Sequence, residues 1–183
     1  MFKNSKTGYG LMAIFLHWLM ALTVFGLFGL GLYMVELTYY DSWYKGSLDL
    51  HKSIGLSLAA VFVFRLLWRH FSVKPSPIGS NKQLNQLAQT AHILMYLFLL
   101  IIMVSGYLIS TADGRPIEVF GFFYVKAIDF AFDSQADIAG QIHFYSACLL
   151  IGFVVLHVLG ALKHHFIDKD KTLIRMITLQ KDD

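Results

Sequence analysis

The chain has 183 residues, of which 56% are hydrophobic and 15% are charged, and its mean hydropathy is +0.57. A water-soluble domain of this length cannot bury so much apolar surface, so the composition indicates a polytopic membrane protein with a single domain over residues 1–183. The net charge is +3 and the single cysteine, Cys148, lies inside an apolar run, which excludes disulfides and thiolate metal sites.

Four long apolar runs predict four transmembrane helices. The expected spans cover about residues 9–35, 48–71, 88–110 and 138–166. Glycines in the second half of the first span permit close approach of a helix or a cofactor. The long connection 111–141 opens with a turn-forming Asp-Gly-Arg-Pro sequence and mixes aromatic with acidic residues. We expect it to form a cap at the membrane interface that contains a short helix.

The basic residues are sorted by connection, which predicts the orientation in the membrane. The two tails and the connection between the second and third spans, with their helix ends, hold eleven of the fifteen basic residues. The other two connections hold four basic and eight acidic residues. The positive-inside tendency therefore predicts a multi-pass protein of the bacterial inner membrane with both termini in the cytoplasm.

Four histidines within the spans pair by depth. His143 and His157 are fourteen residues apart on the last span, which places them on nearly one helix face, about 21 Å apart along the axis. His17 lies as deep from the cytoplasmic side as His157, and His51 lies near the outer end, like His143. Ionisable residues inside a membrane are costly to bury and indicate function, so we expect an inner pair, His17 with His157, and an outer pair, His51 with His143.

Imidazole pairs without other ligands favour haem over zinc. Zinc prefers three or four clustered ligands, often with carboxylate or thiolate, and the spans contain no acidic residue at these depths. Two imidazoles on facing helices are the axial ligands that a b-type haem needs, and they favour electron transfer over oxygen binding. The expected fold is therefore an all-α integral membrane four-helix bundle with two b-type haems.

Basic residues near the helix ends are candidate partners of the haem propionates. The candidates are Lys52 and Arg115 outside, and Arg65, Arg69 and Lys163 inside. Ordinary snorkelling to the interface is an equally good interpretation of each.

Other histidines lie near the cytoplasmic surface. His164 follows His157 by seven residues on the same helix face, where it can deliver protons to a substrate beside the inner haem. A solvated residue at the helix end remains the alternative. His92 enters the third span from the cytoplasmic side, shallower than His157. It competes with His17 as inner ligand, but a propionate or hydrogen-bonding role is favoured.

These residues resemble the bacterial cytochrome b561 family, four-helix di-haem membrane cytochromes that include the superoxide oxidases. The matching motifs are FLHW around His17, LHKSIG around His51, QIHF at His143, LHVLGALKHHFIDKDKTLIRM from His157, and STADGRPIEVFG after the third span. The resemblance implies the same two ligand pairs, a position near bound quinone for His164, electron entry from the periplasm and quinone reduction near the inner haem. The first and second periplasmic loops depart from the superoxide oxidases and indicate a sister branch.

The donor and the partners are open at this stage. The resemblance implies superoxide, oxidised to oxygen, as one donor, but the acidic outer connections would steer an anion poorly and favour a quinol or a basic protein. A periplasmic lipid-binding partner, working with isoprenoids, and a homodimer are further alternatives. A haem-carrying anchor subunit of a larger dehydrogenase is the second hypothesis. A proton-relaying transporter is a weaker third, because the spans lack buried acids and paired broken helices.

Overall fold

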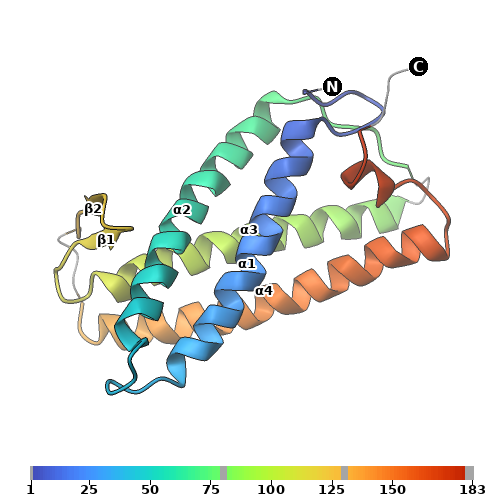
Figure 1. Ribbon diagram of the computed structural model, residues 1–183. Coiled ribbons are helices and arrows are strands. Elements are labelled where there is room, and N and C mark those ends of the chain that lie inside the picture. The colour runs from blue at the N-terminus through green and yellow to red at the C-terminus, as the bar shows by residue number, and fades with distance from the viewer. Residues whose placement is uncertain (1, 79–81, 129–131, 180–183) are drawn as a thin grey trace.

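The computed structural model describes residues 2–78, 82–128 and 132–179, and four long helices dominate it (Figure 1). These are α1 (Leu11–Val35), α2 (Tyr44–Phe71), α3 (Lys82–Ser110) and α4 (Gln135–Phe166). Each is long and apolar enough to cross a membrane by its length and composition. The predicted all-α four-helix membrane architecture is confirmed.

Three of the helices begin earlier in the chain than the apolar runs indicated. Helix α3 starts at Lys82, ahead of the expected residue 88, and α2 and α4 start at Tyr44 and Gln135. The added segments are polar, so a hydropathy pattern does not count them. The start of α3 consists of Lys, Gln, Leu and Asn without Gly or Pro, so it favours continuing the helix beyond the apolar run.

The helices pack as two pairs. Helix α1 packs along α2 and α3 packs along α4, while α1 and α4 hardly approach each other. The pairs cross in Figure 1 and meet at a core of Met20, Leu58 and Phe62, against which Tyr96 and Met103 pack. Side chains that reach between α1 and α4 therefore have to bridge a wider space than those within a pair.

The connection after α3 contains a β-hairpin, and its described residues do not form the short helix that was expected there. Strands β1 (Ile117–Val119) and β2 (Phe123–Val125) pair antiparallel with Val119 opposite Phe123. Phe120 and Gly121 both have positive φ, at 50° and 76°, as a tight hairpin turn requires. The β-branched and aromatic residues of this segment favour strands over a helix. Ile117 and Val119 are buried, and β1 lies against α2.

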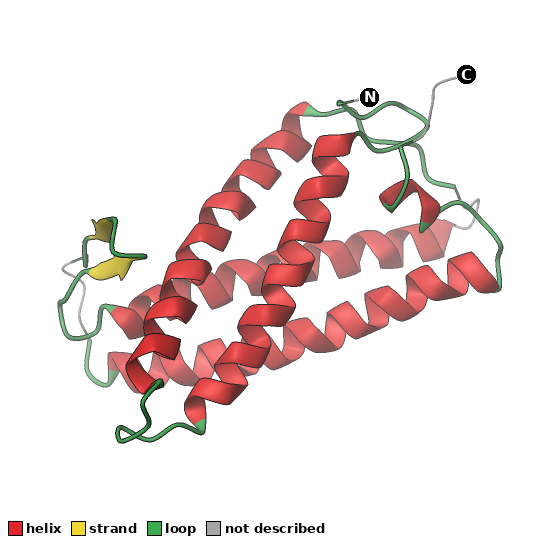
Figure 2. Cartoon of the chain, viewed as in Figure 1, coloured by secondary structure: helices red, strands yellow, loops and turns green. Residues whose placement is uncertain are grey.

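The described parts of the N-terminal and C-terminal tails lie at one end of the bundle, opposite the hairpin (Figure 2). Hydrogen bonds to backbone carbonyls join the tails there, and the Ser76 N–H donates to the Lys6 carbonyl at 3.0 Å. Trp18 Nε1 donates to the Met176 carbonyl at 2.7 Å, in the short helix η1 (Ile174–Met176). Arg175 donates to the Ser76 carbonyl at 2.8 Å. The C-terminal tail therefore folds back onto the part of α1 that carries His17.

Candidate functional site

The four intramembrane histidines meet two by two from three helices. The ring centres of His51 on α2 and His143 on α4 are 6.1 Å apart. Those of His17 on α1 and His157 on α4 are 6.3 Å apart. The structure therefore brings together the same pairs that the spacing along the sequence indicated.

These ring separations suit one metal ion between each pair. A metal–imidazole bond is about 2.0–2.1 Å long, and a ring nitrogen lies about 1.1 Å from its ring centre, given bond lengths near 1.3–1.4 Å. Two imidazoles on opposite sides of one ion therefore place their centres about 6.3 Å apart. Both pairs match this value, so the residues present fit a bis-histidine centre at each level.

The surrounding ligands favour haem iron over zinc. Within the described residues, the one group of three or more clustered His, Cys, Asp or Glu side chains is His164, Asp168 and Asp170, outside the bundle core. Neither histidine pair therefore has a third ligand of this kind, which a protein zinc site requires. The wide spacing of α1 from α4 provides what a flat macrocycle between His17 and His157 needs.

The outer pair has a defined hydrogen-bonding environment. His143 Nδ1 lies 2.9 Å from the Ile102 carbonyl and 3.3 Å from Ser105 Oγ. A carbonyl only accepts, so Nδ1 carries the proton and Nε2 keeps the lone pair that binds a metal. His51 Nδ1 is buried without a hydrogen-bond partner. An unsatisfied buried nitrogen is unfavourable, and a bound group at this level relieves it.

Two glycines lie so close to the imidazole rings of the outer pair that a side chain in their place would contact these rings. A Cβ added to Gly106 would lie 3.0 Å from His143 Cε1 and 3.2 Å from Nδ1, and one added to Gly31 would lie 3.4 Å from His51 Cε1. Gly31 belongs to the first-span glycines from which close approach was expected. Gly26, in the same set, has no atom within 4 Å of its added Cβ. The close contact at Gly106 was not predicted. The sequence shows only a Ser-Gly pair at this point.

Gly106→Ala should lower the occupancy of the outer site or shift its reduction potential. The added methyl group displaces the His143 ring by a few tenths of an ångström and weakens its hydrogen bond to Ile102. Haem content per chain and a redox titration measure both effects. Gly26→Ala is the matched control, because its Cβ enters open space. Identical haem content and potentials in the two variants would contradict the contact.

The inner pair lies beside an arginine. Arg65 Nη2 is 3.2 Å from His17 Nδ1, and Arg65 Nη1 is 3.4 Å from the Leu16 carbonyl. A guanidinium only donates, so in this arrangement Nδ1 of His17 accepts and Nε2 carries the proton. Ligation through Nε2 requires that proton to move to Nδ1 and Arg65 to turn aside. A propionate nearby supplies the negative charge that would draw Arg65 away.

Two arginines and a third histidine complete the inner end. The guanidinium carbons of Arg65 and Arg69 lie 5.8 Å and 5.5 Å from the ring centre of Tyr96. The ring centres of His92 and His157 are 5.1 Å apart, less than the about 6.3 Å expected for two imidazoles on opposite sides of one ion, so this geometry places His92 beside the ligand pair. Helix α3 begins at Lys82, so His92 lies ten residues inside it.

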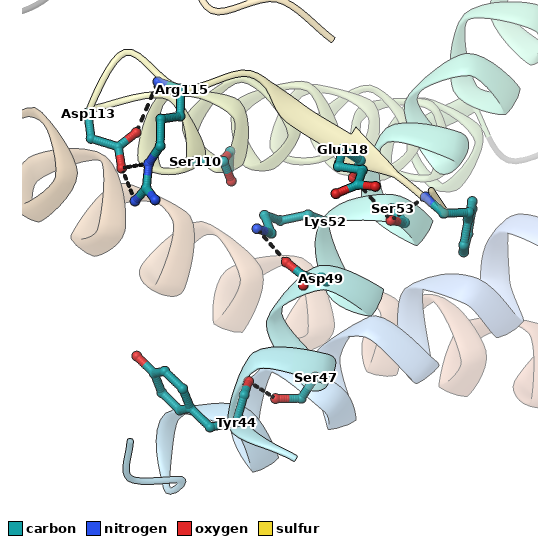
Figure 3. A network of polar contacts seen from close by, with 11 residues as sticks. Tyr44, Ser47, Asp49, Lys52, Ser53, Ser110, Asp113, Arg115 and Glu118 are labelled. Atoms are coloured by element: carbon teal, nitrogen blue, oxygen red, sulfur yellow. Dashed lines mark hydrogen bonds and ion pairs between the residues drawn. The ribbon is translucent and has the colours of Figure 1, made fainter. Parts of the chain in front are cut away.

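The two outer propionate candidates are paired with acids of their own segments (Figure 3). Lys52 Nζ lies 2.8 Å from Asp49 Oδ1. Arg115 bonds Asp113 through Nε at 2.6 Å, and its side chain is 83% exposed. The Arg115 guanidinium holds the pKa of the Asp113 carboxyl below its usual range. Both cations would have to leave these partners in order to reach a propionate.

The hairpin is hydrogen-bonded to α2 close to the outer histidine pair. Ser53 Oγ, two residues after His51, accepts from the Phe120 backbone N–H at 3.1 Å and donates to the Glu118 carbonyl at 3.5 Å. Figure 3 shows Ser53 and Glu118 facing each other between α2 and the hairpin. No pattern in the sequence predicted this link, which joins the outer surface to the helix that carries His51.

His164 is held by carboxylates at the end of α4. Its Nδ1 lies 2.7 Å from Asp170 Oδ2 and 3.1 Å from Asp168 Oδ2. Asp168 is in turn paired with Lys163 at 2.7 Å. Burial alone would raise the pKa of Asp170, but hydrogen bonds from Thr172 and the contact with His164 outweigh it and lower that pKa. A carboxylate on Nδ1 orients the imidazole and leaves Nε2 for proton exchange.

Comparison with known proteins is consistent with this geometry. A family model described as prokaryotic cytochrome b561 matches residues 8–179. Cytochrome b561 homolog 2 of Escherichia coli (strain K12) is 49% identical over 183 residues, which cover 100% of this chain and 97% of that protein. The probable superoxide oxidase CybB of Yersinia pestis is 27% identical over 175 residues, which cover 92% of this chain and 95% of that protein.

Proposed function

This chain belongs to the prokaryotic cytochrome b561 family, and on that premise we propose that it passes electrons through two b-type haems from a periplasmic donor to the membrane quinone pool. The family is one of transmembrane electron transfer, and the four helices make the chain a multi-pass membrane protein. The donor, the quinone and the cytoplasmic position of both termini are parts of the proposal.

One observation carries the proposal: two histidine pairs, each at the separation of a bis-histidine metal centre, share helix α4. The fourteen residues between His143 and His157 correspond to about 21 Å of helix. The hydrocarbon core of a bilayer is about 30 Å thick. Two carriers at these levels would divide the crossing into shorter steps, which a single centre cannot do.

Each side chain has a defined task in this scheme. His17 and His157 hold the inner haem, and His51 and His143 hold the outer one. A b-type haem supplies a one-electron carrier whose iron, ligated by two imidazoles, has no open position for a substrate. Arg65 and Arg69 are the inner propionate contacts that we favour, because no ion pair of either is found among the described residues. Lys52 and Arg115 are weaker candidates, since each is already paired.

Quinone reduction takes up two electrons and two protons per quinone. We propose that His164, oriented by Asp170, passes protons from the cytoplasm to the reduced quinone. The inner placement follows from the positive-inside tendency, since eleven of the fifteen basic residues lie in the tails, the connection after α2 and the helix ends beside them. The N-terminal end of α1 and the helix η1 lie at the same end of the bundle, so this end would face the cytoplasm.

Superoxide is the donor that the likeness to CybB suggests, and the charge of the outer face argues against it. The outer connections and helix ends hold four basic and eight acidic residues, and two of the cations are neutralised by Asp49 and Asp113. An anion is repelled by such a face. We therefore favour a neutral donor or a basic protein.

Stopped-flow haem reduction tests the donor. Mixing with superoxide is expected to reduce the haems slowly, and the rate should rise with ionic strength, because salt screens the repulsion between two negative partners. A basic donor protein should show the opposite salt dependence. Fast reduction by superoxide that slows as salt is added would overturn the charge argument and make superoxide the donor.

A haem-carrying subunit of a larger complex is the second candidate, and the hairpin favours it. Phe122, Phe123 and Tyr124 are exposed at the end of the molecule opposite the termini. Exposed aromatic side chains are enriched at protein interfaces. Native mass measurement separates the cases: a lone chain or a homodimer that reduces quinone argues against a subunit role.

A further inference from the structure

Ser105, a buried serine of α3, faces the outer histidine pair. It is 3% exposed, and its Oγ lies 3.3 Å from His143 Nδ1. The next residue is Gly106, whose lack of a side chain lets the His143 ring lie directly against α3. A buried hydroxyl group is unfavourable unless it is hydrogen-bonded, so the partners of Ser105 show what this position can do.

The Ser105 hydroxyl group is both a donor and an acceptor in this arrangement. Its Oγ lies 2.7 Å from the Ile101 carbonyl and 3.1 Å from the Ile102 carbonyl. A carbonyl only accepts, so the hydroxyl proton points to one of the two, and Ile101 offers the shorter distance. The lone pairs of Oγ then face the proton that the Ile102 carbonyl, 2.9 Å away, places on His143 Nδ1. His143 therefore has two acceptors on α3, a carbonyl oxygen and a hydroxyl oxygen.

The ligand opposite His143 lacks this support. His51 Nδ1 is buried and has no hydrogen-bond partner among the described residues. At the inner level, His17 Nδ1 faces the Arg65 guanidinium at 3.2 Å, and a guanidinium donates but does not accept. The pair of acceptors at Nδ1 therefore distinguishes His143 from both His51 and His17.

We propose that Ser105 is a positioning residue that fixes the His143 ring and lowers the reduction potential of the outer haem. An acceptor on the outer N–H of a ligating imidazole orients the ring and makes its other nitrogen a more basic ligand. A more basic ligand stabilises ferric iron more than ferrous iron, because the ferric ion carries the greater positive charge. The proposal rests on the function proposed above, in which a low outer potential favours passing the electron inward.

Bonding within a single helix is the alternative role of such a serine. A serine hydroxyl group often bonds a carbonyl of the preceding turn and needs no other partner. Ser110 is of this kind: its Oγ donates to the Gly106 carbonyl at 2.9 Å, and it has no hydrogen bond to a histidine in the described part of the chain. Ser110→Ala is therefore the matched control, since it removes a hydroxyl group from the same helix without touching His143.

The test is a potentiometric titration of the purified, haem-loaded protein, in which His143→Ala identifies the inner wave because it retains the inner haem. Ser105→Ala should make the outer haem easier to reduce by about threefold, the scale of one neutral hydrogen bond. This is about 28 mV at 59 mV per tenfold for one electron. Ser105→Cys should shift the outer potential in the same direction, because a thiol fills the space but accepts weakly. Ser105→Thr keeps a hydroxyl group and should stay closest to the wild-type potential.

Electron paramagnetic resonance of the oxidised protein gives a second readout that does not depend on activity. The signal of the outer haem should shift in Ser105→Ala and Ser105→Cys and stay unchanged in Ser110→Ala. An unchanged outer potential in Ser105→Cys, or an equal shift of both haems, would overturn the role of Ser105. Both measurements are made without donor or quinone. A failure to pass electrons to quinone would therefore overturn the proposed function and leave the role of Ser105 standing.

Discussion

Replacing His143 with alanine is expected to leave the purified protein with one b-type haem per chain instead of two. His143 is one of the two outer ligands, at 6.1 Å between ring centres from His51. Its Nδ1 is fixed by the Ile102 carbonyl, so the ring has a single orientation to offer. A haem left with one imidazole has lost half of its axial ligation and is not retained through purification. The ratio of pyridine haemochrome to protein measures the loss.

Two further variants make the result specific to the outer pair. His51→Ala should give the same ratio, and the double variant should lose no more than either single one, since the two side chains serve one centre. His70→Ala is the control, because His70 lies exposed at the end of α2. A full complement of two haems in His143→Ala would show that the outer ligand is another residue.

The second large effect is expected at the inner level. His157→Ala should also retain one haem, but quinone reduction should fall to the background rate. The outer haem should still be reduced by the periplasmic donor, because its ligands His51 and His143 are untouched. Electrons then accumulate on the outer haem, which a stopped-flow trace records as reduction without reoxidation on adding quinone.

His92 offers a strict control for the inner assignment. It lies 5.1 Å from His157, so it is the side chain best placed to replace a lost ligand. We expect no replacement, since the ring centre of His92 lies 5.1 Å away from that of His157 and is therefore displaced from the position where an axial ligand of the inner haem would lie. His92→Ala should therefore keep both haems. Two haems in His157→Ala, together with loss of one in His92→Ala, would reassign the inner ligand to His92.

The fold and the histidine pairing could be predicted because both depend on simple repeats. Apolar runs of membrane-spanning length define the spans, and a spacing of fourteen residues fixes two histidines on one face of α4. The partners of His17 and His51 were then predicted from the expected depth of each histidine in its span. The cytoplasmic position of the termini stays a prediction, since it depends on the charge distribution rather than on the helix packing.

The remaining features depend on contacts between segments that are distant in sequence. The approach of Arg65 to His17 and the bond from Phe120 to Ser53 join different elements, so no local pattern indicates them. The hairpin was missed because its aromatic and acidic residues also suit an interfacial helix. Its strand preference depends on three β-branched residues and a glycine turn.

The early start of α3 and the contact of His92 with His157 were missed for a different reason. Helix α3 extends into polar sequence before its apolar run, and a hydropathy pattern begins counting only where that run begins. His92 therefore lies ten residues from the start of α3, and its ring centre is 5.1 Å from that of His157. Helix ends in polar segments are set by backbone propensity and by contacts of the tails, which apolar periodicity does not report.

The haem-to-chain ratio of the purified wild-type protein, with its reduced spectrum, tests the central claim most directly. Two imidazole pairs at metal-binding separation on separate levels predict two b-type haems per chain, both six-coordinate and unreactive toward carbon monoxide. A colourless protein from haem-replete cells, or a ratio of one with an iron that binds carbon monoxide, would contradict it.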